Sequence, residues 1–169
     1  HGGVVAALLA RRGFSGPSTI FEGQWGLYRS HLVGEMYDLE RLAEGLGTVW
    51  ETLNICYKPY PACHLVHAFM DCVRHFKENE GLEADDVDRI VCRVAEPIVS
   101  RVCEPSPIKK APRTDYDAKF SLQFSVALML TETNVTLDSY SPEKISDPYI
   151  LSISDKVDYE IDPEAPYPE

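Results

Sequence analysis

The 169-residue chain has no cysteine pair at C-x-x-C spacing and no apolar run of membrane-spanning length. Its five cysteines form an odd set, which indicates neither a disulfide framework nor a zinc knuckle and favours a reducing compartment. A membrane-spanning helix needs roughly 18 to 20 consecutive apolar residues, and no segment approaches that length. We therefore expect a cytoplasmic protein with no membrane partner.

Positive charge is also scarce, because the net charge is −11 and no run of Lys or Arg is longer than two residues. Nucleic acids and bilayer surfaces are polyanions, so this balance argues against both as partners. A small anionic metabolite remains a possible ligand, since its site needs only two or three local cations.

The hydrophobic content of 44% is enough for a real core. The pattern of apolar residues, together with prolines and glycines, predicts helices in the first part of the chain. Strands and helices alternate after them. The predicted helices are 3–12, 20–33, 38–45, 62–78, 117–130 and 148–157; the predicted strands are 50–57 and 88–102, with a long polar loop at 104–113. The helix at 117–130 is apolar on nearly every side and should be buried and central.

The predicted fold class is α+β: a small mixed domain with helices packed on a β-sheet, preceded by two or three helices. We place the boundary between residues 1–48 and 49–169, where the composition changes. The chain opens inside an apolar helical run, and 158–162 alternates like a strand with nothing after it to pair with. We expect a fragment of a longer protein, with the second domain truncated at its C-terminus.

The candidate chemistry collects in the proline loop that precedes the helix at 62–78. Pro59 and Pro61 hold Lys58 and Tyr60 in extended conformations, so the backbone alone positions the Lys58 ammonium. Cys63 should fall in the first helical turn, where the helix dipole lowers the pKa of a thiol. The alternatives are a solvated surface lysine and a small buried cysteine.

Two further groups of polar residues are ambiguous. His64, His67 and Asp71 share one stripe of the helix, which suits a metal site or simply a polar surface. Lys119 and Ser121 interrupt the apolar helix at 117–130. They can contribute to a carboxylate site, or reflect helix-end solvation and bonding of the hydroxyl to a backbone carbonyl.

The run Lys58-Pro59-Tyr60-Pro61-Ala62-Cys63 followed by His67 resembles the K-P-Y-P-x-C-x-x-x-H signature of the MmgE/PrpD family. This family includes 2-methylcitrate dehydratase, cis-aconitate decarboxylase and iminodisuccinate epimerase. Segments 3–17, 46–50 and 117–124 resemble further blocks of the same family. The likeness covers nearly the whole chain but only the later part of a family member. It implies that the two or three helices before the mixed domain are left from a larger all-helical domain.

The resemblance implies a cofactor-free, metal-free site for a di- or tricarboxylate substrate, in a protein that forms homodimers. It implies that Lys58 and Cys63 are catalytic, with Lys58 as cation or acid and Cys63 in proton transfer. We expect substrate contacts from Tyr60, His67, Lys119 and Ser121.

The implied parent is a lyase or isomerase, for example one that dehydrates 2-methylcitrate. Family pocket groups from the helical domain have no counterpart here, so the isolated chain should be inactive. The alternatives are a non-catalytic interaction or dimerisation module of the same fold and, third, a metal-binding module on His64, His67 and Asp71.

Overall fold

The computed structural model describes residues 1–32, 37–165 and 167. The chain divides into two compact units, His1–Ile55 and Cys56–Glu169, and each is described by itself. Within the described residues, no helix has both the length and the apolar character needed to cross a membrane.

The first unit contains short helices and little buried surface. Its elements are α1 (Gly2–Arg11), α2 (Leu27–His31) and the 3-10 turns η1 (Glu40–Leu42) and η2 (Glu51–Asn54). Helix α1 confirms the helix predicted over 3–12. The helices predicted over 20–33 and 38–45 are wrong in extent, because only α2 and η1 form there, and Val33 lies outside the described residues.

Few of the described residues in this unit are buried, which explains the shortened helices. Trp25, central to the apolar stripe of the predicted second helix, is 89% exposed, and α1 has no buried residue. Most of the stability of a protein helix comes from packing its apolar face rather than from propensity. Among the described residues of this unit the stripe stays largely exposed, so it does not sustain a long helix.

The strand predicted over 50–57 is wrong. The chain instead forms the turn η2 and an extended segment, with Leu53 86% and Tyr57 85% exposed. Aromatic and β-branched residues favour a strand only where a neighbouring strand supplies hydrogen bonds and a packed face. Among the described residues, this segment belongs to no sheet.

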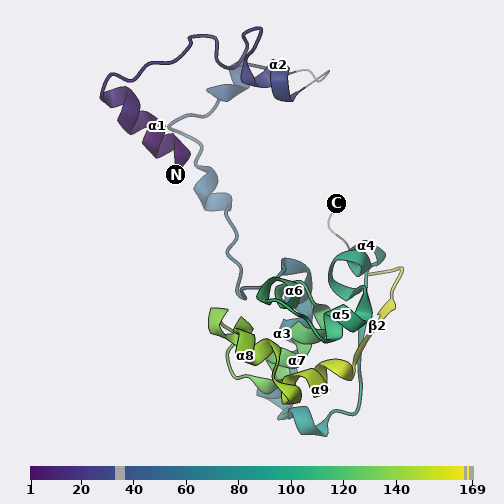
Figure 1. The fold of residues 1–169 in the computed structure, drawn as a ribbon. Coiled ribbons are helices and arrows are strands. Elements are labelled where there is room, and N and C mark those ends of the chain that lie inside the picture. The colour runs from purple at the N-terminus through teal and green to yellow at the C-terminus, as the bar shows by residue number, and fades with distance from the viewer. Residues whose placement is uncertain (33–36, 166, 168–169) are drawn as a thin grey trace. The chain divides into compact units, whose positions relative to one another are not determined.

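The second unit is an α+β arrangement, which confirms the predicted fold class. Its helices and strands, with the 3-10 turns and one π-helical turn (η5), follow in chain order (Figure 1): η3 (His64–Val66), α3 (His67–Glu80), η4 (Ala84–Asp86), β1 (Ile90–Val94), α4 (Glu96–Ile98), η5 (Val99–Cys103), α5 (Ser106–Lys110), α6 (Asp115–Lys119), α7 (Leu122–Thr131), η6 (Leu137–Tyr140), α8 (Pro142–Ile145), α9 (Pro148–Asp155) and β2 (Val157–Ile161).

A two-stranded parallel sheet joins distant parts of this unit. Strand β1 pairs with β2, with Ile90 opposite Val157 and Val94 opposite Ile161. Parallel strands need a long crossover connection, which the helices between them provide. The expectation that the segment at 158–162 lacks a partner is therefore wrong. The strand predicted over 88–102 ends at Val94, because Pro97 occupies the first turn of α4.

Helix α7 is the centre of the core. Every residue from Leu122 to Leu130 is buried, and α7 packs against α3, α9 and β2. This confirms the expected central helix, although the helix predicted over 117–130 is interrupted. Helix α6 ends at Lys119, and the Ser121 hydroxyl caps α7 by accepting the Phe124 N–H at 3.0 Å.

Of the helix predicted over 148–157 and the loop predicted over 104–113, only the helix is confirmed. The helix predicted over 148–157 is confirmed as α9, where an Asp147 carboxylate oxygen accepts the Tyr149 N–H at 2.8 Å. The loop predicted over 104–113 is wrong in character, because α5 forms within it. Pro107 lies in the first turn of α5, where its missing N–H breaks no intrahelical bond.

Candidate functional site

The proline loop brings two nitrogen groups to one backbone oxygen. The Lys58 Nζ donates to the Ala62 carbonyl at 3.1 Å, and the His67 Nε2 lies 3.2 Å from the same oxygen. Pro59 and Pro61 favour the extended conformations of the residues before them, and the chain bends through 59–62. The loop therefore holds the ammonium and the imidazole close together at the start of α3.

Lys58 is exposed, whereas the His67 side chain is partly buried. Burial is the main cause that lowers the pKa of His67, and the nearby Lys58 ammonium lowers it further. The imidazole is therefore held neutral at neutral pH. A neutral imidazole beside an exposed ammonium can accept a proton from a ligand while the ammonium binds a carboxylate.

Tyr60 packs against His67 and hydrogen-bonds to α3. It is 5% exposed, its ring lies edge-on to the His67 ring at 5.4 Å, and its hydroxyl donates to Asp71 at 2.7 Å. Arg74 donates to the same Asp71 oxygen at 2.9 Å. Burial and then the Asp71 hydrogen bond raise the pKa of Tyr60 to about 12. The Tyr60 hydroxyl is thus committed to Asp71, and its ring holds His67 in place.

Cys63 is placed differently from the sequence expectation. Helix α3 begins only at His67, so Cys63 precedes the 3-10 turn η3, and its N–H donates to the Lys119 carbonyl at 2.8 Å. The prediction that Cys63 lies in the first turn of the long helix is therefore wrong. The side chain is 6% exposed and belongs to the core cluster.

Lys119 and Ser121 lie at the break between α6 and α7. The Lys119 ammonium donates to Asp115 at 2.9 Å and lies 5.7 Å from the centre of the Tyr140 ring. The Ser121 hydroxyl donates to the Lys109 carbonyl while it caps α7, and Ser121 is fully buried. The Lys119 carbonyl accepts the Cys63 N–H and so connects this break to the proline loop. Both hydrogen bonds of the Ser121 hydroxyl are made to the backbone of the fold.

Lys109 also lies at this break, and no sequence motif indicated it. Its ammonium donates to the carbonyls of Phe120 at 2.7 Å and Arg101 at 2.8 Å. Burial lowers the pKa of Lys109, and the Asp117 carboxylate acts in the opposite direction. Its position in one of the few basic pairs of an acidic chain was the available signal.

The metal alternative on His64, His67 and Asp71 is wrong. Among residues 1–32, 37–165 and 167, no three His, Cys, Asp or Glu side chains are arranged to hold an ion. His64 is exposed, His67 faces the Ala62 carbonyl, and Asp71 is bonded to Tyr60 and Arg74. The polar residues His67 and Asp71 of α3 therefore bind the proline loop through Ala62 and Tyr60.

Lowering the pH from 7.5 to 5.5 is expected to destabilise the second unit through His67. Because the folded-state pKa is below the ordinary value of 6.5, the unfolded chain binds more protons, and stability is lost as pH falls through that value. Urea unfolding of His67→Gln should show a shallower pH dependence than the wild type. The matched control is His64→Gln, which removes the exposed neighbour. Equal pH slopes for His67→Gln and wild type would contradict this account.

Comparisons with known proteins point to one family. Residues 60–169 match the model of the MmgE/PrpD C-terminal domain. The cis-aconitate decarboxylase-like protein oryM of Aspergillus oryzae is 23% identical over 164 residues, which cover 91% of this chain and 34% of that protein. Cis-aconitate decarboxylase of Homo sapiens is 25% identical over 171 residues, which cover 96% of this chain and 33% of that protein. The chain thus spans about a third of the length of these relatives.

Proposed function

Because the chain belongs to the MmgE/PrpD family, whose C-terminal domain its residues 60–169 match, we propose that it is part of a cofactor-independent lyase or isomerase of di- or tricarboxylic acids. The observation that carries this proposal is the convergence of Lys58 and His67 on the Ala62 carbonyl. An exposed cation beside a neutral imidazole suits a substrate that carries carboxylates and loses a proton.

We assign Lys58 to bind a substrate carboxylate and stabilise the negative charge that develops when the adjacent carbon loses its proton. His67 is suited to accept or return a proton, because its pKa lies below the ordinary value. Cys63 remains a candidate for proton transfer. Its side chain is 6% exposed, so contact between the thiol and a ligand requires that the loop open first.

The substrate class follows from the relatives and from the sequence signature. The two relatives are named for decarboxylation of cis-aconitate, and the resemblance of the proline loop also extends to dehydration of 2-methylcitrate. Both substrates are tricarboxylates. We propose a tricarboxylate as the ligand and expect the isolated chain to bind it without turning it over. Measured turnover of cis-aconitate or 2-methylcitrate by these 169 residues would refute that expectation.

Replacing Lys58 with alanine is expected to weaken binding of cis-aconitate by about fivefold, since a charge-assisted contact to an exposed ammonium contributes roughly 1 kcal/mol. Isothermal titration calorimetry on the 169-residue chain measures this. The control is Arg93→Ala, which removes the same charge from the exposed face of β1. An unchanged affinity in Lys58→Ala, or an equal loss in both variants, would count against Lys58 as the binding cation.

A further inference from the structure

The His67 ring is held on one face of α3 by its contacts with the proline loop. Its Nε2 lies 3.2 Å from the Ala62 carbonyl oxygen, and the Tyr60 ring meets it edge-on at 5.4 Å. One turn further along the same face, Asp71 accepts the Tyr60 hydroxyl at 2.7 Å. The ring is therefore fixed by the backbone of the loop and by a tyrosine that is itself bonded to α3.

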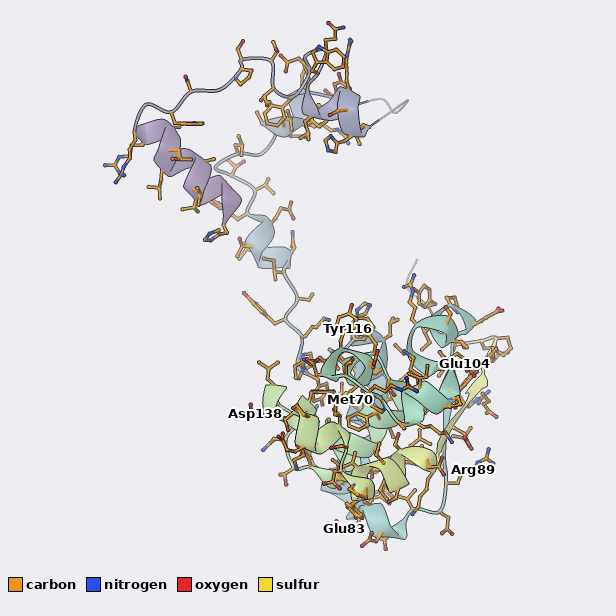
Figure 2. All side chains as sticks on the ribbon, viewed as in Figure 1. Met70, Glu83, Arg89, Glu104, Tyr116 and Asp138 are labelled. Carbon is orange, nitrogen blue, oxygen red and sulfur yellow. The ribbon has the colours of Figure 1, made fainter. Side chains whose placement is uncertain are left out.

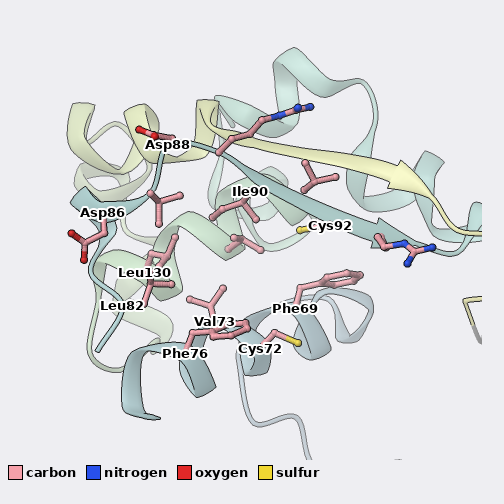
Figure 3. A pocket seen from close by; sticks show the side chains of 15 residues that line it. Phe69, Cys72, Val73, Phe76, Leu82, Asp86, Asp88, Ile90, Cys92 and Leu130 are labelled. Atoms are coloured by element: carbon pink, nitrogen blue, oxygen red, sulfur yellow. The ribbon is translucent and has the colours of Figure 1, made fainter. Parts of the chain in front are cut away.

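The other sides of α3 are occupied by packing. Met70 is fully buried among the side chains of the second unit (Figure 2). Phe69, Cys72 and Phe76 lie roughly 140° to 200° around the helix from His67, at about 100° per residue. They line a largely apolar groove against β1, with a volume of about 810 Å³ (Figure 3). His67 does not line that groove, so its imidazole belongs to the proline loop.

The partner of Nε2 determines which nitrogen of His67 carries the proton. A carbonyl oxygen accepts hydrogen bonds and cannot donate them, and in a neutral imidazole one nitrogen donates while the other accepts. Nε2 must therefore carry the proton in order to bond to Ala62, which leaves the lone pair on Nδ1. Turning the ring over would bring a carbon to this position and lose the bond. The Ala62 oxygen has two lone pairs, so the Lys58 ammonium can donate to it as well.

The second nitrogen of the ring, Nδ1, is open to a ligand. In the part of the chain that the structure describes, no group forms a hydrogen bond with Nδ1. It is also not among the buried side-chain atoms that lack a partner. The exposed part of the partly buried His67 side chain therefore includes Nδ1.

We infer that Nδ1 is the atom of His67 that takes a proton from the substrate, and that Ala62 is a positioning residue whose carbonyl fixes this assignment. The inference rests on the proposed function and names its reacting atom. The Nδ1 lone pair bonds to the proton of a substrate C–H group. The electron pair of the broken C–H bond passes into the adjacent carboxylate, beside the Lys58 ammonium.

The imidazolium formed in this step carries a proton on each nitrogen. In an isomerisation it returns the Nδ1 proton to the substrate carbon. In a dehydration it gives that proton to the hydroxyl group, which leaves as water. The bond from Nε2 to Ala62 is kept throughout, so the ring ends in the tautomer in which it began.

Nitrogen NMR of the 169-residue chain with labelled histidine, at pH 7.5, measures the tautomer directly. The signals of His67 and His64 are assigned by their loss in His67→Gln and His64→Gln. We expect His67 to be the Nε2–H tautomer alone, while the exposed His64 exchanges between both forms. An Nδ1–H tautomer of His67, or a mixture like that of His64, overturns the inference whether or not a ligand binds.

Titration with cis-aconitate then tests the role of Nδ1. We expect the acid to shift the Nδ1 resonance of His67 more than the Nε2 resonance. A larger shift of Nε2 overturns the inference and leaves the proposed function standing. Absence of binding overturns the proposed function, and the role of Nδ1 with it.

Two variants test the bond to Ala62 without a ligand. The amide N–H of His67→Gln lies near the position of Nε2 and can still donate to the Ala62 carbonyl, whereas the side chain of His67→Asn is too short. We expect His67→Gln to unfold at the same urea concentration as wild type at pH 7.5, and His67→Asn at a lower one. Equal midpoints for the two variants would overturn the positioning role of Ala62.

Discussion

Replacing Lys77 with methionine is expected to destabilise the second unit by about 2 to 3 kcal/mol. The Lys77 ammonium donates to the carbonyls of Met129, Leu130 and Glu132 at 2.9, 2.7 and 2.8 Å. These carbonyls lie at the C-terminal end of α7, where the last C=O groups of a helix have no partner within the helix. One side chain from α3 therefore closes the end of the central helix.

The magnitude follows from the charge on the donor. A hydrogen bond to a charged group contributes roughly 1.5 to 3 kcal/mol, and partial exposure of Lys77 reduces the sum for three bonds. Methionine keeps the apolar stem of the side chain, so the loss reports mainly on the ammonium. Urea unfolding followed by circular dichroism measures the change, with Glu78→Ala on the exposed neighbouring position as control. Equal stability of Lys77→Met and wild type would show that water replaces these bonds without cost.

The second large effect is expected for Ser121→Ala, with a loss of about 2 to 3 kcal/mol of unfolding free energy. The hydroxyl accepts the Phe124 N–H as the cap of α7 and donates to the Lys109 carbonyl. Loss of a helix cap costs roughly 1 kcal/mol, and loss of the hydrogen bond to the partly buried Lys109 carbonyl adds roughly 1 to 2 kcal/mol. Chemical unfolding measures the loss, and Ser152→Ala on the exposed face of α9 should stay within about 0.5 kcal/mol of wild type.

This variant also separates two roles for Ser121. A serine that contacts the ligand would lose affinity for cis-aconitate while the fold keeps its stability. A serine that is used inside the fold would lose stability, as the buried hydroxyl indicates. A stable Ser121→Ala chain with weakened binding would therefore contradict the structural role and restore the contact expected from the sequence.

The sequence predicted the elements whose signals are local. The apolar run at 122–130 indicated a buried helix, and Asp147 before Pro148 marked the start of α9. Local signals wrongly predicted a strand at 50–57 and did not reveal the pairing of β1 with β2, because strand pairing depends on segments far apart in the chain. The interruption at Ser121 was missed since a serine in an apolar run reads equally well as a mid-helix residue and as a cap.

For the candidate site, the sequence indicated a stiff loop but not its geometry. The prolines marked a rigid loop, and the loop does hold Lys58 near His67. The direction of the Ala62 carbonyl, on which both groups converge, has no sequence signature. Because α3 begins only at His67, Cys63 lies outside the first turn of this helix, and its side chain is in the core. Such features depend on how the loop packs on α6, through the bond from Cys63 to Lys119.

The carboxylate site at the proline loop is the central feature of the proposed function. The most direct measurement is a map of amide chemical shifts for the isotopically labelled 169-residue chain during titration with cis-aconitate. We predict that the largest changes fall on Ala62, Cys63 and His67, and that they diminish in Lys58→Ala. Changes confined to other surfaces, or no change at saturating concentrations of the acid, would contradict the assignment of this loop as the binding site.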